Sequence, residues 1–400
     1  MNILYCCEEY PPGKNGGIGS MVKLLATSLA ALGHQVYVVG LYPHGYGGAD
    51  YEEDQGVKIY RLRYTTDWGL IRNNFSFTDN LLYRLLRFTG LLNWDARRSS
   101  QRLFAKIQAL VQQHAIDIIE IPDWNTFLHN TRSPIILPDL GAPLVVKFHG
   151  SHSYLRHQAG LPVHPIIFEA EKALLQKATA LVAVSQYTAQ QTAALFNLQQ
   201  PIKVLYNGIP LPPHNQLPVA AGKIVFAGAL SVNKGVPVLL QAWNLVHQQY
   251  PQATLHLYGK GPVQQLKKIL SGSAASNVQF HGHMPGQTVM AAFATATAAV
   301  FPSQAECFAL APLEAMAQGC PVIYTNQSSG PELIKHGQNG LLINPNNAGD
   351  IAAAIIQLLQ NPGLRKRLAA AGKATMAERF NIQAIAQQHL DYYKTIATQP

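Results

Sequence analysis

Short apolar runs alternate with amphipathic stretches along the first half of the chain. The runs have the length of buried strands, and the stretches between them carry apolar residues every three or four positions, as helices that cover a sheet do. Strands that alternate with helices form parallel sheets joined by crossover helices. The pattern predicts strands at 2–7, 35–40, 116–121, 144–148, 180–184 and 203–205, with helices at 20–32 and 166–177.

A proline-rich segment separates this series from a second one of the same kind. Residues 206–222 contain Pro210, Pro212, Pro213 and Pro218, which is typical of a linker between domains. After this segment, the pattern predicts strands at 224–227, 254–258, 278–281, 298–301 and 321–324, and helices at 236–249, 263–269, 350–359, 365–379 and 382–396.

The length of the chain agrees with two domains, because 400 residues exceed what one hydrophobic core usually organises. The predicted fold class is α/β, with two Rossmann-like doubly wound parallel-sheet domains that face a cleft. We expect the first domain at residues 1–205 and the second at 223–381, joined by the linker at 206–222.

Composition narrows the class of protein. With 48% hydrophobic and 13% charged residues, the chain is globular rather than disordered. It has four cysteines, without a C-x-x-C pair or a zinc-binding spacing, which indicates a reducing compartment and no structural metal. The first residues lack the basic start and cleavage site of a secretory signal, and no apolar stretch reaches the roughly 18 residues of a membrane span. We therefore expect a cytoplasmic protein.

Positive charge is concentrated in one segment. The net charge is +9, and the segment from Lys58 to Lys106 holds ten Lys or Arg, three Asp and no Glu, interleaved with leucine, phenylalanine and tryptophan. Two interpretations stay open: amphipathic helices with a solvated arginine face, or a surface that grips an acidic acceptor or contacts an anionic membrane peripherally, at its inner face. Nucleic-acid binding is not expected, because no recognition motif accompanies the charge.

Two carboxylates, Glu306 and Glu314, lie eight positions apart across a predicted helix start. Pro312 suits the first turn of such a helix, and Gly319 suits the residue just past its end. Both glutamates can accept hydrogen bonds from sugar and ribose hydroxyls. The start of the helix would direct backbone N–H groups at an anion such as a diphosphate, from Phe308, Ala309 and Leu310. Together these features predict a nucleotide-sugar site.

The same stretch resembles a known motif. Phe301-Pro302-Ser303 precedes the first glutamate, and Glu-Ala-Met-Ala-Gln-Gly-Cys-Pro-Val-Ile follows at 314–323. This arrangement resembles the E-x7-E motif of retaining glycosyltransferase family 4, although the family most often has Gly where this chain has Ala309. The resemblance implies the GT-B fold, in which the last helix, 382–400 here, crosses back to the first domain. The sequence does not decide whether it does so.

The segment Phe226–Gly235 resembles a second element of that family, G-R-L-x-x-x-K-G. Lys234 matches the lysine, whereas Ala229 stands where the family has arginine. In the family these cations lie against the donor diphosphate, where they stabilise the charge that develops on the leaving group. The resemblance therefore implies a catalytic role for Lys234 and leaves open whether Ala229 alters the choice of donor.

Further positions match the family more weakly. By resemblance, Gly16 and Gly17 let the loop after the first strand approach the donor or the acceptor, and His149 reaches the transferred sugar. Three more residues are implied near the donor, the last two beside the nucleotide base: Gly261, His283 and Met284. The sequence lacks D-x-D and H-E-x-x-H motifs, so no metal is expected at the site.

Taken together, the resemblance implies a retaining, metal-independent and cofactor-free glycosyltransferase that moves a hexose from a nucleotide-diphosphate sugar, first of all a UDP-sugar, to a hydroxyl acceptor of unknown class. The expected catalytic residues are His149, Lys234 and Glu306. The expected donor-binding residues are Gly16, Gly17, Lys234, Gly261, His283, Met284, Glu306, Phe308, Ala309, Leu310 and Glu314.

Two alternatives stay open. A nucleotide-sugar 2-epimerase shares the two-domain architecture but not the context of the two glutamates. A non-catalytic module that binds nucleotide sugars is suggested by Ala229, because one expected cation is missing there.

Overall fold

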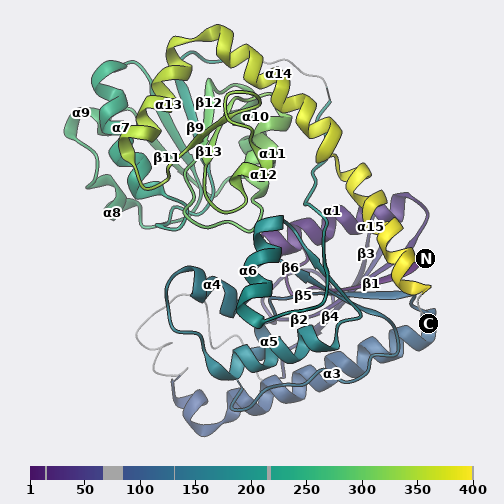
Figure 1. Ribbon diagram of the computed structural model, residues 1–400. Helices are drawn as coiled ribbons and strands as arrows, with labels where there is room; N and C mark the ends of the chain where they lie inside the picture. The colour runs from purple at the N-terminus through teal and green to yellow at the C-terminus, as the bar shows by residue number, and fades with distance from the viewer. Residues whose placement is uncertain (14–15, 66–83, 130, 214–217, 399–400) are drawn as a thin grey trace. The chain divides into compact units, whose positions relative to one another are not determined.

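The computed structural model describes residues 1–398 except 14–15, 66–83, 130 and 214–217 (Figure 1). The described chain divides into two compact units. Unit 1 comprises the residues up to Tyr206 together with the C-terminal segment that begins at Ile382. Unit 2 comprises Asn207–Asn381. Each unit is built on its own β-sheet with helices packed on it (Figure 1).

The described residues of unit 1 form an eight-stranded sheet in the order β3-β4-β2-β1-β5-β6-β7-β8. All neighbours pair in parallel except β3 and β4. The strands are β1 Asn2–Cys6, β2 Gln35–Tyr42, β3 Tyr51–Asp54, β4 Val57–Arg63, β5 Ile118–Pro122, β6 Leu144–Phe148, β7 Ala180–Ala183 and β8 Ile202–Val204. The helices are α1 Gly17–Ala31, α3 Leu91–His114, η1 Thr126–Leu128, α4 His152–Gln158, α5 Pro165–Lys177, α6 Gln186–Phe196 and α15 Ile382–Ala397, and the described residues 84–89 are also helical.

The sequence pattern predicted neither β3 nor β4, whereas α3 agrees with the interpretation of the basic segment as an amphipathic helix with a solvated arginine face. Strand β3 consists of Tyr-Glu-Glu-Asp and has no apolar alternation, because it is an edge strand that only β4 pairs with. On β4, a buried position is occupied by Arg61, which forms an ion pair of 2.7 Å with Glu52. On β4 a charged residue therefore occupies a buried position where alternation would place an apolar one.

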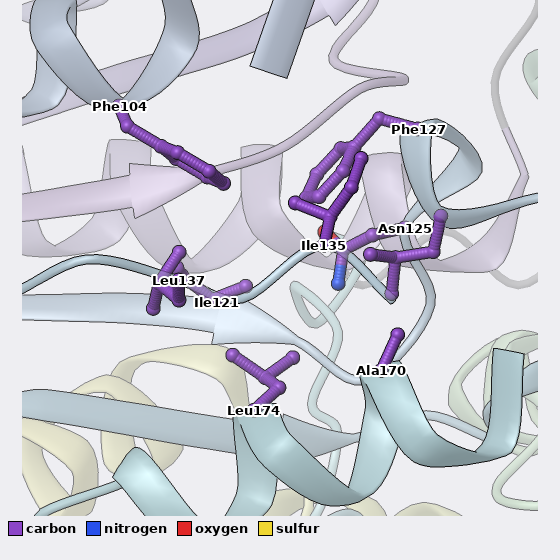
Figure 2. A pocket seen from close by; sticks show the side chains of 9 residues that line it. Phe104, Ile121, Asn125, Phe127, Ile135, Leu137, Ala170 and Leu174 are labelled. Atoms are coloured by element: carbon purple, nitrogen blue, oxygen red, sulfur yellow. The ribbon is translucent and has the colours of Figure 1, made fainter. Parts of the chain in front are cut away.

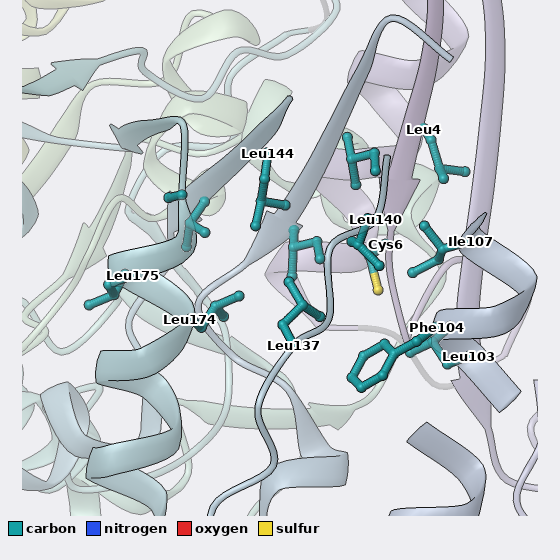
Figure 3. Packing of buried hydrophobic residues seen from close by; sticks show 14 of the residues in the cluster. Leu4, Cys6, Leu103, Phe104, Ile107, Leu137, Leu140, Leu144, Leu174 and Leu175 are labelled. Atoms are coloured by element: carbon teal, nitrogen blue, oxygen red, sulfur yellow. The ribbon is translucent and has the colours of Figure 1, made fainter. Parts of the chain in front are cut away.

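The core of unit 1 explains why α3 forms, although its segment is strongly basic. Leu103, Phe104, Ile107, Leu110 and Val111 recur at helical spacing and are buried against the sheet. Figure 3 shows this face of α3 next to Leu4 and Cys6 of β1, with Leu174 and Leu175 of α5 in the same cluster. The cavity left between α3, β5 and α5 holds only about 10 Å³, which is scarcely room for one water (Figure 2).

Helix α15 belongs to unit 1 and packs against α1 and β5 (Figure 1). A buried polar network joins it to the sheet. Lys147 Nζ on β6 lies 2.8 Å from Nε2 of His389, whose Nδ1 donates to the carbonyl oxygen of Ile385. The hydroxyl of Tyr393 donates to the Glu120 carboxylate on β5 over 2.5 Å. The helix is thus fixed to two central strands by groups that are costly to bury without partners.

The described residues of unit 2 form a six-stranded sheet in the order β11-β10-β9-β12-β13-β14, in which all neighbours pair in parallel. The strands are β9 Lys223–Ala227, β10 Thr254–Tyr258, β11 Val278–Gly282, β12 Ala298–Phe301, β13 Val322–Thr325 and β14 Leu341–Ile343. The helices are α7 Val236–Gln249, α8 Val263–Lys267, α9 Gly272–Ala275, α10 Gly286–Ala294, α11 Leu310–Ala317, α12 Gly330–Leu333, α13 Ala348–Gln360 and α14 Pro362–Arg379.

The predicted α/β class with two doubly wound sheets is confirmed. In each unit the chain starts at a central strand, extends the sheet to one edge, returns, and extends it to the other edge. Of the predicted linker at 206–222, residues 214–217 lie outside the described residues. Among the described helices, none combines the length and the apolar character needed to cross a bilayer.

The His389 network predicts a specific dependence of stability on pH. Burial lowers the pKa of His389 well below its ordinary value. Below about pH 6.5 the unfolded chain therefore binds a proton that the folded chain does not, and the free energy of unfolding falls as the pH falls. Replacing His389→Gln removes this contribution. The melting temperature of the variant should approach that of the wild type as the pH drops from about 7.5 to about 5.5.

The matched control is His157→Gln, because His157 is exposed on α4. Its difference from the wild type should stay constant over the same range. A constant difference for His389→Gln as well would contradict the neutral, buried state of this imidazole.

Candidate functional site

The carboxyl ends of the six parallel strands of unit 2 gather the loops that follow them at one edge of its sheet. Strands β9 and β12 are neighbours, and the chain winds outward from them in opposite directions. Ligands of open α/β sheets bind outside the carboxyl ends of the strands at such a switch point. The loop after β9 carries Lys234, and the loop after β12 carries Glu306. The two expected catalytic residues of this unit therefore flank its switch point.

Backbone hydrogen bonds hold these loops together. The Gln304 amide in the loop after β12 donates to Asn233 O in the loop after β9 over 2.9 Å. The loop after β9 is in turn bonded to the loop after β10, and that loop to the end of β11, through Leu230 N–Lys260 O and Gly259 N–Gly282 O. These loops therefore form one layer, and the backbone positions from which their side chains extend are fixed.

Lys234 and Glu306 form an ion pair in this layer, with 2.5 Å between Nζ and Oε1. The lysine side chain is 33% exposed and the glutamate side chain 10% exposed. The amide of Glu306 also donates to Ser328 Oγ, in the loop after β13, over 3.3 Å. Ser328 has a φ of 53°, a left-handed conformation that is costly for a residue with a side chain. An anion can therefore reach Lys234, while Glu306 is held from two sides.

Gly235 makes the close approach of the two loops possible. Its φ is 70°, and a Cβ atom placed on it would lie 1.9 Å from the carbonyl oxygen of Pro302. No other residue type fits this position without moving the backbone. The glycine after Lys234 is thus required by the contact between the loops after β9 and β12.

Helix α11 begins at Leu310, directly after the Glu306 loop, and its first turn has no side-chain cap. Its end is a Schellman motif, in which Gly319 N donates to Met316 O and Cys320 N to Ala315 O, with Gly319 at φ 75°. The predicted helix with Gly319 just past its end is confirmed. Ala309 has φ −75° and ψ 140°, which any residue adopts, so the departure from the family glycine causes no backbone strain.

Glu314 lies on the second turn of α11 and is partly buried. Burial raises the pKa of its carboxyl group. Phe308 is buried, and its carbonyl oxygen accepts a hydrogen bond from Nδ2 of Asn207 over 3.2 Å. This contact fixes the turn ahead of the helix. The expected donor residues Gly261, His283 and Met284 follow β10 and β11, at the same edge of the sheet.

In unit 1 the switch point lies between β1 and β5. The carboxylate of Glu9, in the loop after β1, accepts hydrogen bonds from Gly16 N and Gly19 N over 2.9 Å each. Sequence reasoning missed this residue, because a glutamate that caps a glycine loop has no pattern of its own. A Cβ on Gly19 would lie 1.9 Å from Glu9 O, whereas nothing approaches Gly17 within 4 Å. Gly17 remains an open position at the start of α1.

His149 follows β6, and a buried carboxylate directly after the neighbouring strand β5 holds its loop. Asp123 Oδ1 accepts from His149 N over 2.8 Å and Oδ2 from Gly150 N over 3.1 Å. Burial raises the pKa of Asp123 to about 7. Burial, and then Lys147, lowers the pKa of His149 well below its ordinary value, so the imidazole is neutral at physiological pH. A neutral imidazole can donate one hydrogen bond and accept another.

The expected site residues thus fall into two groups. Gly16, Gly17 and His149 belong to unit 1, at the carboxyl ends of β1 and β6. The other group belongs to unit 2: Lys234, Gly261, His283, Met284, Glu306, Phe308, Ala309, Leu310 and Glu314.

Comparison with known proteins covers almost the whole chain. Residues 15–211 match the family model described as Glycosyltransferase Family 4, and residues 221–361 match the one described as Glycosyl transferases group 1. The chain is 30% identical to a D-inositol 3-phosphate glycosyltransferase of Arthrobacter, over 98% of this chain and 93% of that protein. It is 26% identical to a glycogen synthase of Mycobacterium tuberculosis, over 98% and 94% of the two chains.

Solved structures share the fold. The sucrose-phosphate synthase of Thermosynechococcus elongatus superposes with a TM-score of 0.77 at 20% identity, over 99% of both chains. The Anabaena protein HepE, solved in complex with UDP-glucose, superposes with a TM-score of 0.68 at 19% identity, over 99% of this chain and 100% of that one.

The glycine between the loops after β9 and β12 provides a direct test of the site geometry. Gly235→Ala should lower the free energy of unfolding by about 1 kcal/mol or more, because alanine is strained at a positive φ and its methyl group meets Pro302 O. The matched control is Gly286→Ala, because nothing lies within 4 Å of the added Cβ at the start of α10. Denaturant unfolding measures both. Equal stability of the two variants would contradict the close approach.

Proposed function

Because this chain belongs to glycosyltransferase family 4 and is a glycosyltransferase of the GT-B type, we propose that it transfers a hexose from a nucleotide-diphosphate sugar to a hydroxyl acceptor. We propose further that the transfer retains the configuration of the sugar and needs no metal ion. The observation that carries this proposal is the Lys234–Glu306 pair at the β9/β12 switch point, directly ahead of the uncapped start of α11.

Lys234 and the start of α11 would hold the diphosphate. The partly exposed ammonium group and the positive end of the helix both favour a doubly charged anion. The negative charge on the bridging oxygen grows as the glycosidic bond breaks, so these groups stabilise the transition state more than the ground state. Lys234 would leave Glu306 for the phosphate, and the glutamate would then accept hydrogen bonds from sugar hydroxyls.

Glu314 and His149 would complete the contacts. The raised pKa of Glu314 suits a carboxyl group that pairs with the ribose hydroxyls in a partly buried place. Neutral His149 would bond a hydroxyl of the transferred sugar. The acceptor hydroxyl would attack the anomeric carbon on the face from which the diphosphate departs, and its proton would pass to the leaving phosphate oxygen. Retention rests on the E-x7-E resemblance.

The donor and the positive charge that would stabilise its diphosphate are the next parts of the proposal. HepE was solved with UDP-glucose, which favours a UDP-sugar as the first donor to test. Within the part of the chain that the structure describes, no three His, Cys, Asp or Glu side chains gather where they could hold a metal ion. In the proposed metal-free transfer, Lys234 and the amides at the start of α11 would stabilise the charge on the diphosphate. Ala229 leaves Lys234 as the cation that the family element supplies here.

A thermal-shift panel of nucleotide sugars tests the proposal, because a ligand that binds only the folded state raises the melting temperature. One nucleotide sugar should raise it, and Lys234→Met should lower kcat/KM for transfer from that donor about 10²-fold to 10³-fold. The matched control is Lys268→Met, because Lys268 is exposed just past the end of α8. It should leave kcat/KM unchanged.

Three outcomes would contradict the proposal. They are a panel without any shift, transfer by Lys234→Met at the rate of the wild type, and the appearance of an epimeric nucleotide sugar when the donor is incubated alone. The last outcome would favour the 2-epimerase.

A second part of the proposal concerns peripheral contact with an anionic membrane. Of the basic segment 58–106, residues 66–83 lie outside the described residues. Arg61 and Arg63 form ion pairs with β3 and the residue before it, so they do not belong to an open basic surface. The rest exposes three large apolar side chains among arginines: Leu85 is 56% exposed, Phe88 84% and Trp94 47%. Apolar and cationic side chains in this mixture suit a lipid headgroup layer.

Vesicles test the membrane contact. Phe88→Ser should weaken binding to phosphatidylglycerol vesicles in a sedimentation assay, and added salt should weaken the binding of the wild type. Val232→Ser is the matched control, because Val232 is similarly exposed, at 63%, on unit 2. Binding that is absent, or that neither salt nor Phe88→Ser changes, would contradict the contact.

A further inference from the structure

A cavity of about 450 Å³ in unit 1 is lined by five basic or imidazole side chains: Arg87, His129, His152, Arg156 and His164. Apolar residues of the segment 162–167 form the rest of the described wall. The volume is that of a small-molecule site. None of the glycosyltransfer roles assigned above uses these five residues.

The topology of unit 1 brings them together. His129 follows η1, which follows the carboxyl end of β5, and His152 opens α4, just beyond the carboxyl end of β6. Arg156 lies one turn later on α4, and His164 is the residue before α5. The cavity therefore lies at the sheet edge where ligands of α/β domains bind. His152 is three residues from His149, in the loop that holds the expected sugar contact.

The described lining is positively charged without a compensating acid. Glu171, a buried carboxylate on α5, accepts hydrogen bonds from His152 N and from Ser151 Oγ, so it is occupied by the start of α4. Burial, and then the charges of His152 and His164, lowers the pKa of His129 to about 4. Burial, and then Arg156, lowers the pKa of His152. Burial is the larger cause of both lowered pKa values and the neighbouring cationic groups add to it, so an anion bound among them would raise both pKa values.

Two imidazole nitrogens lack partners. Nδ1 of His152 and Nδ1 of His164 are buried and have no hydrogen-bond partner among the described residues. A buried polar atom without a partner is costly unless a ligand or water completes it. By contrast, Nε of Arg156 donates to Pro162 O over 2.5 Å, which fixes the plane of its guanidinium group. The cavity thus offers an oriented guanidinium and two imidazoles with unused capacity.

We propose that this cavity binds the phosphate group of a phosphorylated acceptor. Arginine recognises phosphate through paired N–H groups, and Arg87 and Arg156 line the same space. The histidines would donate further hydrogen bonds, and the volume leaves room for a sugar-sized group beside the phosphate. The role as acceptor site rests on the proposed function, whereas the binding of phosphate does not. A soluble sugar phosphate and a lipid phosphate share this chemistry.

Titration with inorganic phosphate, followed by NMR of the histidine side chains, tests the binding directly. Phosphate should raise the pKa of His129 and His152, whereas chloride at the same ionic strength should not. Arg156→Gln should weaken phosphate binding about tenfold or more, because a charge-assisted hydrogen bond is lost. Arg87→Gln, on an exposed helix at 84–89, should weaken it in the same direction and tests the inference if Arg156→Gln does not fold.

The matched control is Arg367→Gln on the exposed face of α14, which should leave phosphate affinity unchanged. The inference is overturned if phosphate and chloride act alike, if both cavity variants bind phosphate as the wild type does, or if Arg367→Gln weakens binding equally.

Two further probes identify the source of the phosphate. Glycerol 3-phosphate stands for soluble acceptors, and vesicles of phosphatidylcholine with phosphatidic acid stand for lipid acceptors. Binding of either probe that Arg156→Gln weakens supports the inference and names the source, and binding of neither overturns it. Because donor binding is measured separately by thermal shift, loss of phosphate binding with an intact donor shift refutes only the cavity. An absent donor shift with intact phosphate binding refutes only the proposed glycosyl transfer.

Discussion

Parallel strand pairing is the constraint on which the candidate site depends. Every crossover returns the chain to the same edge of its sheet, so the loops that follow successive strands gather at the carboxyl ends. In unit 2 this brings Lys234 to Glu306, 72 positions further along the chain. The backbone bond from Gln304 N to Asn233 O fixes the separation of their loops. The topology thus brings the two side chains together, and their opposite charges form the ion pair.

The loops of unit 1 are held by a different device, in which carboxylates accept hydrogen bonds from backbone amides. Glu9 holds the glycine loop, Asp123 holds the His149 loop, and Glu171 holds the start of α4. Burial raises the pKa of both Asp123 and Glu171 to about 7. Each carboxylate supplies the negative partner that an N–H cluster would otherwise seek in a ligand. The basic cavity beside them has no such internal partner in its described lining, which sets it apart as a place for an external anion.

Much of the fold was predictable from local patterns, and the exceptions have physical causes. Strands buried on both faces read as continuous apolar runs, and Gly319 marks a helix end that the structure confirms. Strand β3 escaped prediction because it is a charged edge strand. Helix α3, by contrast, agrees with the amphipathic-helix interpretation of the basic segment, because its apolar stripe is buried and its arginines lie outside that stripe.

The residue types and their spacing along the chain were enough to indicate an α/β glycosyltransferase and to single out Lys234, Glu306 and Glu314, because short motifs record local backbone geometry. Contacts between distant segments needed the folded chain. Three such contacts join residues that no periodicity in the sequence relates. They are the hydrogen bonds from the glycine loop to Glu9, the contact between Lys147 and His389, and the lining of the basic cavity. Such contacts arise only when packing decides which polar groups leave water together, and each of those groups then requires a partner.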